Sequence, residues 1–148
     1  MQAEGAVAVT REVRITAAPE TVFAFLVDPE KLLQWKGVEA TLEPEPGGAF
    51  RVNVTGAQLV SGEFVEVLPP RRVVFTWGWE GDEDVPPGSS TVEITLEPDG
   101  DETVVTLTHR DLPEGAEAPH VEGWEHFLPR LVAAAEGRDP GRDPWVSG

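Results

Sequence analysis

Apolar and polar residues alternate through most of the first 110 positions, and this period of two is typical of strands with one buried face. The first run covers residues 7–15, where Val7, Val9, Val13 and Ile15 share a face. Six further runs are predicted as strands, at residues 38–43, 50–55, 61–68, 73–79, 91–97 and 104–110. Tight turns separate several neighbouring runs, so we expect an antiparallel sheet with one covered face.

Two short helices are predicted between the first and second strands. Residues 18–20, Ala-Pro-Glu, place a proline at the first helical position and an acid in the first turn, which is typical of a helix start. Asp28 precedes another proline and is expected to cap a second helix that runs to about Trp35. Neither segment has enough apolar surface to cover the sheet.

From about Ala118 onward, the apolar residues recur with the spacing of a long helix. Five apolar residues then fall on one helical stripe: Val121, Trp124, Leu128, Leu131 and Ala135. Because only this element can cover the sheet, the predicted fold class is α+β. We expect a single domain over residues 1–136 and an irregular C-terminal tail over residues 137–148.

The chain of 148 residues carries 27 acidic and 11 basic side chains, which gives a formal net charge of −16. This charge disfavours nucleic acids and anionic membranes as partners, because both attract basic surfaces. The sequence has no cysteine, no Gly-Lys-Ser/Thr phosphate loop, no Gly-x-Ser-x-Gly elbow and no His-Glu-x-x-His motif. We therefore expect neither a metal nor a cofactor. The first residues lack a basic, apolar signal segment, so a cytoplasmic location is expected.

Several short segments, taken in order, resemble one known family. They are residues 10–13, 18–23, Trp35, 46–50 (Pro-Gly-Gly-Ala-Phe), 62–64, 69–77, 103–109 (Thr-Val-Val-Thr-Leu-Thr-His) and 123–131. Over about residues 7–136 the chain resembles the SRPBCC (START/Bet v 1-like) superfamily, and within it the AHSA1-type proteins, which are like the Hsp90 ATPase activator homologue. The resemblance implies a helix-grip fold, in which a curved antiparallel sheet of about six to seven strands wraps around the C-terminal helix. It also implies a cavity between sheet and helix for an apolar small molecule.

Aromatic and aliphatic side chains on the inward faces are the candidate walls of that cavity. The set comprises Phe25, Trp35, Phe50, Val52, Phe64, Phe75, Trp77, Ile94, Leu107, Trp124, Phe127 and Leu128. Such side chains are typical of sites for flat or lipid-like ligands. They can equally fill the interior and leave a solid core.

His109 is the candidate for chemistry. It shares a strand face with Val105 and Leu107, which directs it toward the helix and any cavity. A neutral imidazole there can bind a ligand or act as a general base near pH 7. The alternative is a structural histidine whose ring is paired inside the core.

Arg11 is the second polar residue expected on an inward face. A guanidinium in that position needs a carboxylate partner, because an unpaired buried charge is very costly. Glu63, Glu66 and Glu125 are within reach by their predicted positions. Arg11 can instead anchor the acid group of a ligand, so it is included among the candidate ligand-binding residues.

Three functions remain open at this point. The first is non-enzymatic binding of a small hydrophobic or aromatic molecule between the sheet and the C-terminal helix. The second is a cyclase- or hydrolase-type enzyme that uses His109 with Arg11 or a glutamate, although no nucleophile–base pair is recognisable. The third, implied by the resemblance, is a module that associates with an Hsp90-type chaperone. Because no nucleophile–base pair is recognisable, the first function is favoured. The sequence leaves open whether the protein is a monomer or a homodimer.

Overall fold

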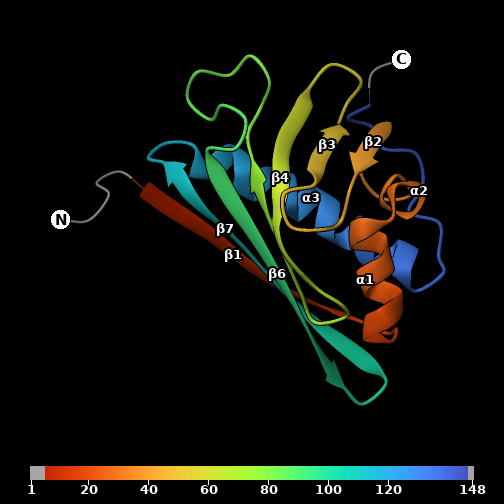
Figure 1. Ribbon diagram of the computed structural model, residues 1–148. Helices are drawn as coiled ribbons and strands as arrows, with labels where there is room; N and C mark the ends of the chain where they lie inside the picture. The colour runs from red at the N-terminus through yellow and green to blue at the C-terminus, as the bar shows by residue number, and fades with distance from the viewer. Residues whose placement is uncertain (1–5, 147–148) are drawn as a thin grey trace.

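The computed structural model describes residues 6–146, which form a seven-stranded sheet, one long helix and two short helices (Figure 1). The elements in chain order are β1 (Ala6–Ile15), α1 (Pro19–Val27), α2 (Pro29–Leu32), β2 (Glu39–Leu42), β3 (Ala49–Asn53), β4 (Leu59–Leu68), β5 (Arg72–Trp77), β6 (Ser90–Asp99), β7 (Glu102–Pro113) and α3 (Glu117–Ala135). The predicted α+β class and helix-grip arrangement are confirmed. Within residues 6–146, no helix has both the length and the apolar character needed to cross a membrane.

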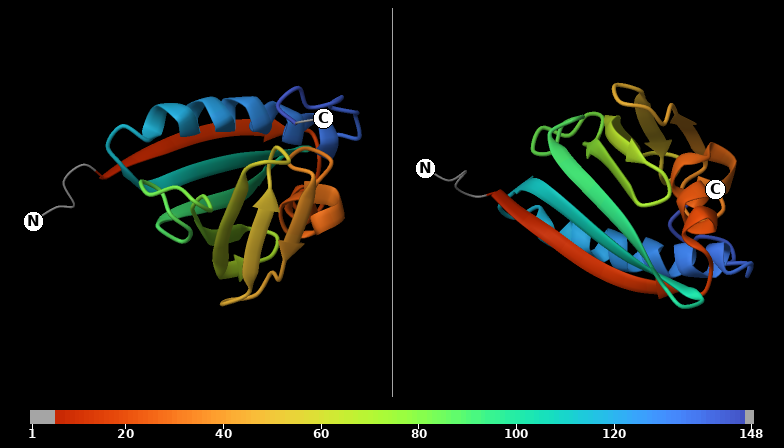
Figure 2. Two further views of the ribbon diagram at one scale, coloured as in Figure 1. Left: turned by 90° about the horizontal axis from the view of Figure 1, so that it is seen from above. Right: turned by 60° about the horizontal axis from the view of Figure 1, so that its bottom comes forward.

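All neighbouring strands run antiparallel in the order β1-β7-β6-β5-β4-β3-β2. Strands β2 to β7 each lie beside their neighbour in the chain, whereas β1 joins the edge of β7, with Val13 opposite Val105. The sheet bends around α3, and α1 lies beside one end of that helix (Figure 2). This topology places β1, the first strand, against α3, the last helix.

Local sequence signals explain where the short helices begin. Pro19 occupies the first position of α1, and Asp28 caps α2 by accepting hydrogen bonds from the backbone N–H groups of Glu30, at 2.9 Å, and Lys31, at 3.4 Å. The expected cap is therefore confirmed. Helix α2 ends at Leu32, however, and a turn rather than a helix continues to Trp35.

The strand predicted over residues 73–79 is wrong at its end, because β5 stops at Trp77. Gly78 packs so closely on the following loop that a Cβ atom at this position would lie 1.7 Å from the carbonyl oxygen of Pro86. Trp79 leaves the ladder and forms only an isolated bridge with Val60. The loop that follows, residues 78–89, thus folds back along β4.

The inside of the grip is filled by aromatic rings. Phe50 stacks on Phe75 with ring centroids 4.0 Å apart, and Phe64 meets both rings edge-on. Trp35 is also buried, and it donates its indole N–H to the carbonyl oxygen of Phe25 in α1 at 2.9 Å. This part of the fold is a solid core, which was one of the two alternatives for the aromatic set.

The tail after α3 packs against the fold instead of extending away from it. Helix α3 runs through Pro129, and from its outer face Arg130 donates hydrogen bonds to the carbonyl oxygens of Pro140 and Gly141. The Trp145 ring stacks on His126 with centroids 3.7 Å apart. The tail therefore adds a short layer over α3.

We expect Phe75→Ala to lower the free energy of unfolding by about 3–5 kcal/mol, because it leaves a cavity inside a close-packed aromatic core. Urea denaturation followed by tryptophan fluorescence measures the effect. The control is Val65→Ala on β4, where the side chain is 52% exposed and the expected change is within about 0.5 kcal/mol. Equal effects in the two variants would contradict the solid core.

Candidate ligand-binding cleft

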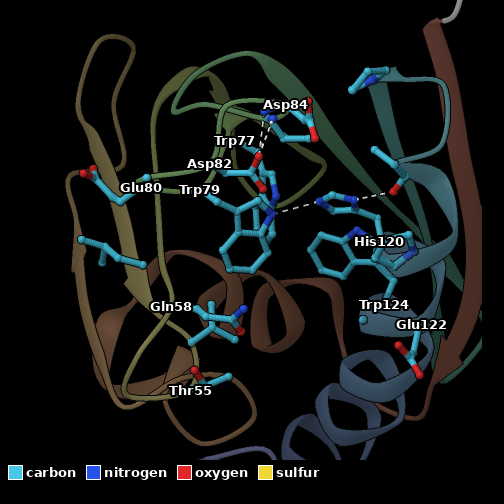
Figure 3. Close-up of a pocket in the computed structure, with 18 of the residues that line it drawn as sticks. Thr55, Gln58, Trp77, Trp79, Glu80, Asp82, Asp84, His120, Glu122 and Trp124 are labelled. Atoms are coloured by element: carbon cyan, nitrogen blue, oxygen red, sulfur yellow. Dashed lines mark hydrogen bonds between the residues drawn. The ribbon is translucent and has the colours of Figure 1, made fainter.

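A cleft of about 1070 Å³ lies at the N-terminal half of α3 (Figure 3). One side is formed by α3 and the segment before it, and the other by the β3–β4 connection and the loop over residues 78–89. The apolar wall is made of Trp77, Trp79, Trp124 and Phe127. The cleft is therefore beside the solid core, at the end of the sheet where β5 stops.

Three tryptophans form the aromatic wall through mutual contacts. Trp77 and Trp79 meet edge-to-face with ring centroids 5.5 Å apart, and Trp77 lies 5.2 Å from Trp124. The early end of β5 makes this possible, because Trp79 would point to the same face as Trp77 but farther along if the strand continued. Trp77 and Trp124 are each 3% exposed, whereas Trp79 is half-buried, so Trp79 presents most of the indole surface that faces the open space.

A chain of hydrogen bonds fixes this wall to the sheet. The indole N–H of Trp124 donates to Nδ1 of His109 at 3.1 Å, so that nitrogen carries no proton. The proton is then on Nε2, which donates to the hydroxyl oxygen of Ser90 at 2.8 Å. Ser90 in turn donates to the carbonyl oxygen of Trp77 at 2.7 Å. The chain connects α3, β7, β6 and β5 and leaves both nitrogens of His109 occupied.

His109 is neutral because of its surroundings. The residue is 0% exposed, and burial is the main cause that lowers its pKa to about 2, with smaller electrostatic contributions from His120 and Lys36. The ring does not reach the cleft surface. The strand parity that directed His109 inward is confirmed, and its geometry is that of a structural histidine with no lone pair free to act as a general base.

A second tryptophan–histidine hydrogen bond crosses the cleft itself. Trp79 donates its indole N–H to Nε2 of His120 at 3.1 Å, as the dashed line in Figure 3 marks, and Nδ1 of His120 pairs with the carbonyl oxygen of Ala116 at 2.8 Å. His120 therefore carries its proton on Nδ1 and is neutral in this arrangement. Burial is the main cause that lowers the pKa of His120. The bond ties the loop after β5 to the first turn of α3.

Lys36 is the least expected residue of the cleft. It follows α2, its side chain is only 4% exposed, and its ammonium lies 4.1 Å from the ring centre of Trp77 and 4.2 Å from that of Trp124. Phe127 is a third ring, at 5.4 Å. Burial lowers the pKa of Lys36 well below its ordinary value. Cation–π contacts of this kind favour the charged form and partly offset the burial.

The opening of the cleft is acidic. Six carboxylates line it: Glu80, Asp82, Glu83, Asp84, Glu114 and Glu122. Two of them also hold the loop, since Glu80 accepts a hydrogen bond from the hydroxyl of Ser61 and Asp82 accepts from the backbone N–H groups of Asp84 and Val85. This rim repels multiply charged anions and tolerates neutral or cationic groups.

Arg11 lies outside the cleft. Among its three candidate partners the structure selects Glu125 of α3, whose carboxylate accepts from Nε at 3.2 Å and from a terminal nitrogen at 3.0 Å. The Arg11 side chain is 36% exposed and its partner 58%, so this is a surface ion pair that joins β1 to α3. Such pairs contribute little to stability.

Only three of the residues expected to bind a ligand line the cleft, namely Trp77, Trp124 and Phe127. The others lie in the core or, for Arg11, at the surface; the buried ones are Phe25, Trp35, Phe50, Val52, Phe64, Phe75, Ile94, Leu107, His109 and Leu128. Sequence reasoning missed Lys36, Trp79, His120 and Trp145 as wall residues. Two features of the sequence could have pointed to these residues: the pair of tryptophans at positions 77 and 79, and the lysine directly after Trp35.

A curved antiparallel sheet that grips a C-terminal helix, with two short helices after the first strand and a cleft between sheet and helix, defines a protein of the SRPBCC superfamily. Within that class, the family model described as "Activator of Hsp90 ATPase homolog 1-like protein" matches residues 16–136, and the chain belongs to this family.

Three relatives illustrate the range of similarity. The solution structure of an AHSA1-like protein from Rhizobium etli is 51% identical, covers 97% of this chain and 90% of its own, and superposes with a TM-score of 0.76. DynU16, described as a protein in the dynemicin biosynthetic locus, is 26% identical, with 92% of this chain and 50% of its own covered and a TM-score of 0.77. The human activator of 90 kDa heat shock protein ATPase homolog 1 is 27% identical over 120 residues, which are 80% of this chain but 34% of the human protein.

We expect stability to fall as the pH decreases from 7 to 5.5. The unfolded chain binds a proton at His109 near its ordinary pKa of 6.5, whereas the folded chain does not until about 2, so acid favours unfolding. His109 alone should remove about 1 kcal/mol over this interval. Urea denaturation across the pH series measures this loss in the free energy of unfolding. His120, whose pKa is also lowered, should add to the loss.

An NMR titration tests the same assignment without a variant. The ring of His109 should keep the chemical shifts of the neutral Nε2–H tautomer throughout the pH range 7 to 5. A His109 signal that titrates near pH 6.5 would contradict the buried hydrogen-bond chain. The stability measurement can then be repeated with His109→Gln, in which the slope over this pH interval should decrease.

Proposed function

We propose that this protein binds a small aromatic or otherwise flat apolar molecule in the cleft beside α3. The observation that carries the proposal is the wall of Trp77, Trp79, Trp124 and Phe127 around one open space. Sites for organic ligands are concave, predominantly apolar and roughly 300–1,000 Å³ in volume, with a few placed polar groups. The cleft, at about 1070 Å³, is slightly larger than this range, and it has polar groups at Lys36 and on the acidic rim.

The hydrogen bonding of the wall supports binding over histidine-based catalysis. Both ring nitrogens of His109 and both of His120 are engaged with protein groups. A general base needs a free lone pair within reach of the proton that it removes. The cyclase- or hydrolase-type alternative therefore loses its candidate base, while a rigid aromatic wall suits a carrier or sensor of a small molecule.

The acidic rim narrows the chemical class of ligand. With Glu80, Asp82 and Glu122 at the opening, a polyphosphate or a dicarboxylate would approach against a negative field. A neutral aromatic compound would not. One structural relative, DynU16, is described as a protein in a biosynthetic locus, which is consistent with a small-molecule role for this cleft.

The sharpest test fills the cleft without removing any contact. Gly123 lies on α3 in the cleft lining, and a Cβ atom added there meets nothing within 4 Å. We expect Gly123→Phe to abolish binding of the neutral fluorescent probe N-phenyl-1-naphthylamine, since the new ring occupies the space. Stability should hold or rise, because replacing glycine inside a helix removes a cost of up to about 1 kcal/mol. Probe fluorescence and urea denaturation measure the two effects.

Ala118→Phe is the matched control. Ala118 is exposed on the same helix and is absent from the cleft lining, so a ring there leaves the cleft unchanged. The control variant should bind the probe as the wild type does. Equal binding by all three proteins would mean that the probe sits elsewhere and would overturn the assignment of this cleft.

A second candidate function follows from the family. The human relative is named as an activator of the 90 kDa heat shock protein ATPase, and its match to this chain covers 120 residues. The chain spans about a third of the human protein's length, so that activity is a proposal for the present chain. Its test is the rate of ATP hydrolysis by an Hsp90 with and without this protein. If this chain activates Hsp90, the rate of ATP hydrolysis should rise with the wild-type protein and with Gly123→Phe alike. An unchanged rate would contradict this second function.

A further inference from the structure

Lys36 has no counter-ion in a protein that is rich in acids. The chain carries 27 acidic side chains, yet within residues 6–146 no hydrogen bond or ion pair joins any of them to this ammonium. Burial is the sole cause of its lowered pKa, which means that no carboxylate is close enough to offset it. Buried lysines are ordinarily paired or else become neutral amines.

The groups that surround Lys36 include no carboxylate partner among the described residues. Trp77 from β5, with Trp124 and Phe127 from α3, present ring faces. The titratable groups that couple to it electrostatically are His109 of β7 and His120 of α3, and both are neutral in their hydrogen-bonded forms, so neither supplies a counter-charge. The aromatic rings contribute partial compensation, but they supply no proton acceptor.

We infer that Lys36 is a reactive amine at the base of the cleft, which forms an imine with an aromatic aldehyde or ketone held in the cleft. The inference rests on the proposed ligand cleft and names the class of ligand for it. Two observations carry it: the buried amine without a partner, and its place in the lining of an aromatic space large enough for a ring-bearing carbonyl compound.

The reaction balances without an oxidant or a reductant. The nitrogen lone pair of Lys36 attacks the carbonyl carbon, a C–N bond forms as the C=O π bond breaks, and one of the two N–H protons of the amine passes to the oxygen to give a carbinolamine. Loss of the hydroxyl with a second proton releases one water and leaves the C=N bond. The neutral imine, like the neutral amine, needs no counter-ion, so burial that disfavours the ammonium favours the product.

The chain provides its own control, because Lys31 and Lys36 are its only lysines. Lys31 is half-buried, and its ammonium also lies over a ring, that of Phe25 at 5.2 Å, but it is absent from the cleft lining. The two lysines therefore share a ring contact and differ in burial and in access to the cleft.

The experiment is reductive trapping of the wild-type protein with 2-naphthaldehyde and sodium cyanoborohydride at pH 6.5. Mass spectrometry of peptides cleaved at acidic residues locates the naphthylmethyl group. We expect the adduct on Lys36 in excess over Lys31 and the N-terminal amine, and loss of that adduct in Lys36→Met and in Gly123→Phe. Lys36→Met keeps the volume of the side chain and removes a buried charge, which is compatible with folding.

The outcomes separate this inference from the proposed function. If N-phenyl-1-naphthylamine binds in the cleft while Lys36 stays unmodified, the cleft is a ligand site and the imine is overturned. Labelling of Lys31 equal to that of Lys36 overturns it as well. If the probe does not bind and Lys36 is unmodified, the proposed function fails together with the inference. Labelling of Lys36 that Gly123→Phe blocks supports both.

Discussion

The hydrogen bond from Trp124 to His109 holds the wall of the cleft in place. It joins α3 to β7, and through Ser90 it reaches the end of β5, so one helix and three strands share a single polar connection inside an apolar core. Each donor has one acceptor, and the neutral imidazole fits only one tautomer. His109 cannot take a proton without breaking this chain, because both of its ring nitrogens are already hydrogen-bonded.

The position of the cleft follows from where that connection ends. Strand β5 stops at Trp77, Gly78 turns against Pro86, and Trp79 crosses to His120 on α3. Core packing fills the sheet up to this point, and the open space begins beyond it. The buried Lys36 then occupies the boundary between the two regions, with aromatic rings on the core side and carboxylates confined to the rim.

Much of this fold could be predicted, because alternation reveals which face of a strand is buried. The alternation along β7 predicted that His109 points inward, and the proline after Asp28 predicted that Asp28 caps a helix. Periodicity does not say which buried faces meet, so it could not separate the rings that close on each other, such as Phe50 and Phe75, from those that border a space, such as Trp77. Lys36 lies in a turn with no period at all, and only the packing of α3 against β5 encloses it.

The pairing of β1 with β7 has a consequence for how the chain is made. Strand β1 finds its neighbour only when β7 has emerged, and α3, which also packs on β1, comes later still. Pairing at this sequence separation makes folding slow and leaves an apolar strand edge open during synthesis. The net charge of −16 then acts on the nascent chain, because mutual repulsion keeps such unfinished copies from joining edge to edge.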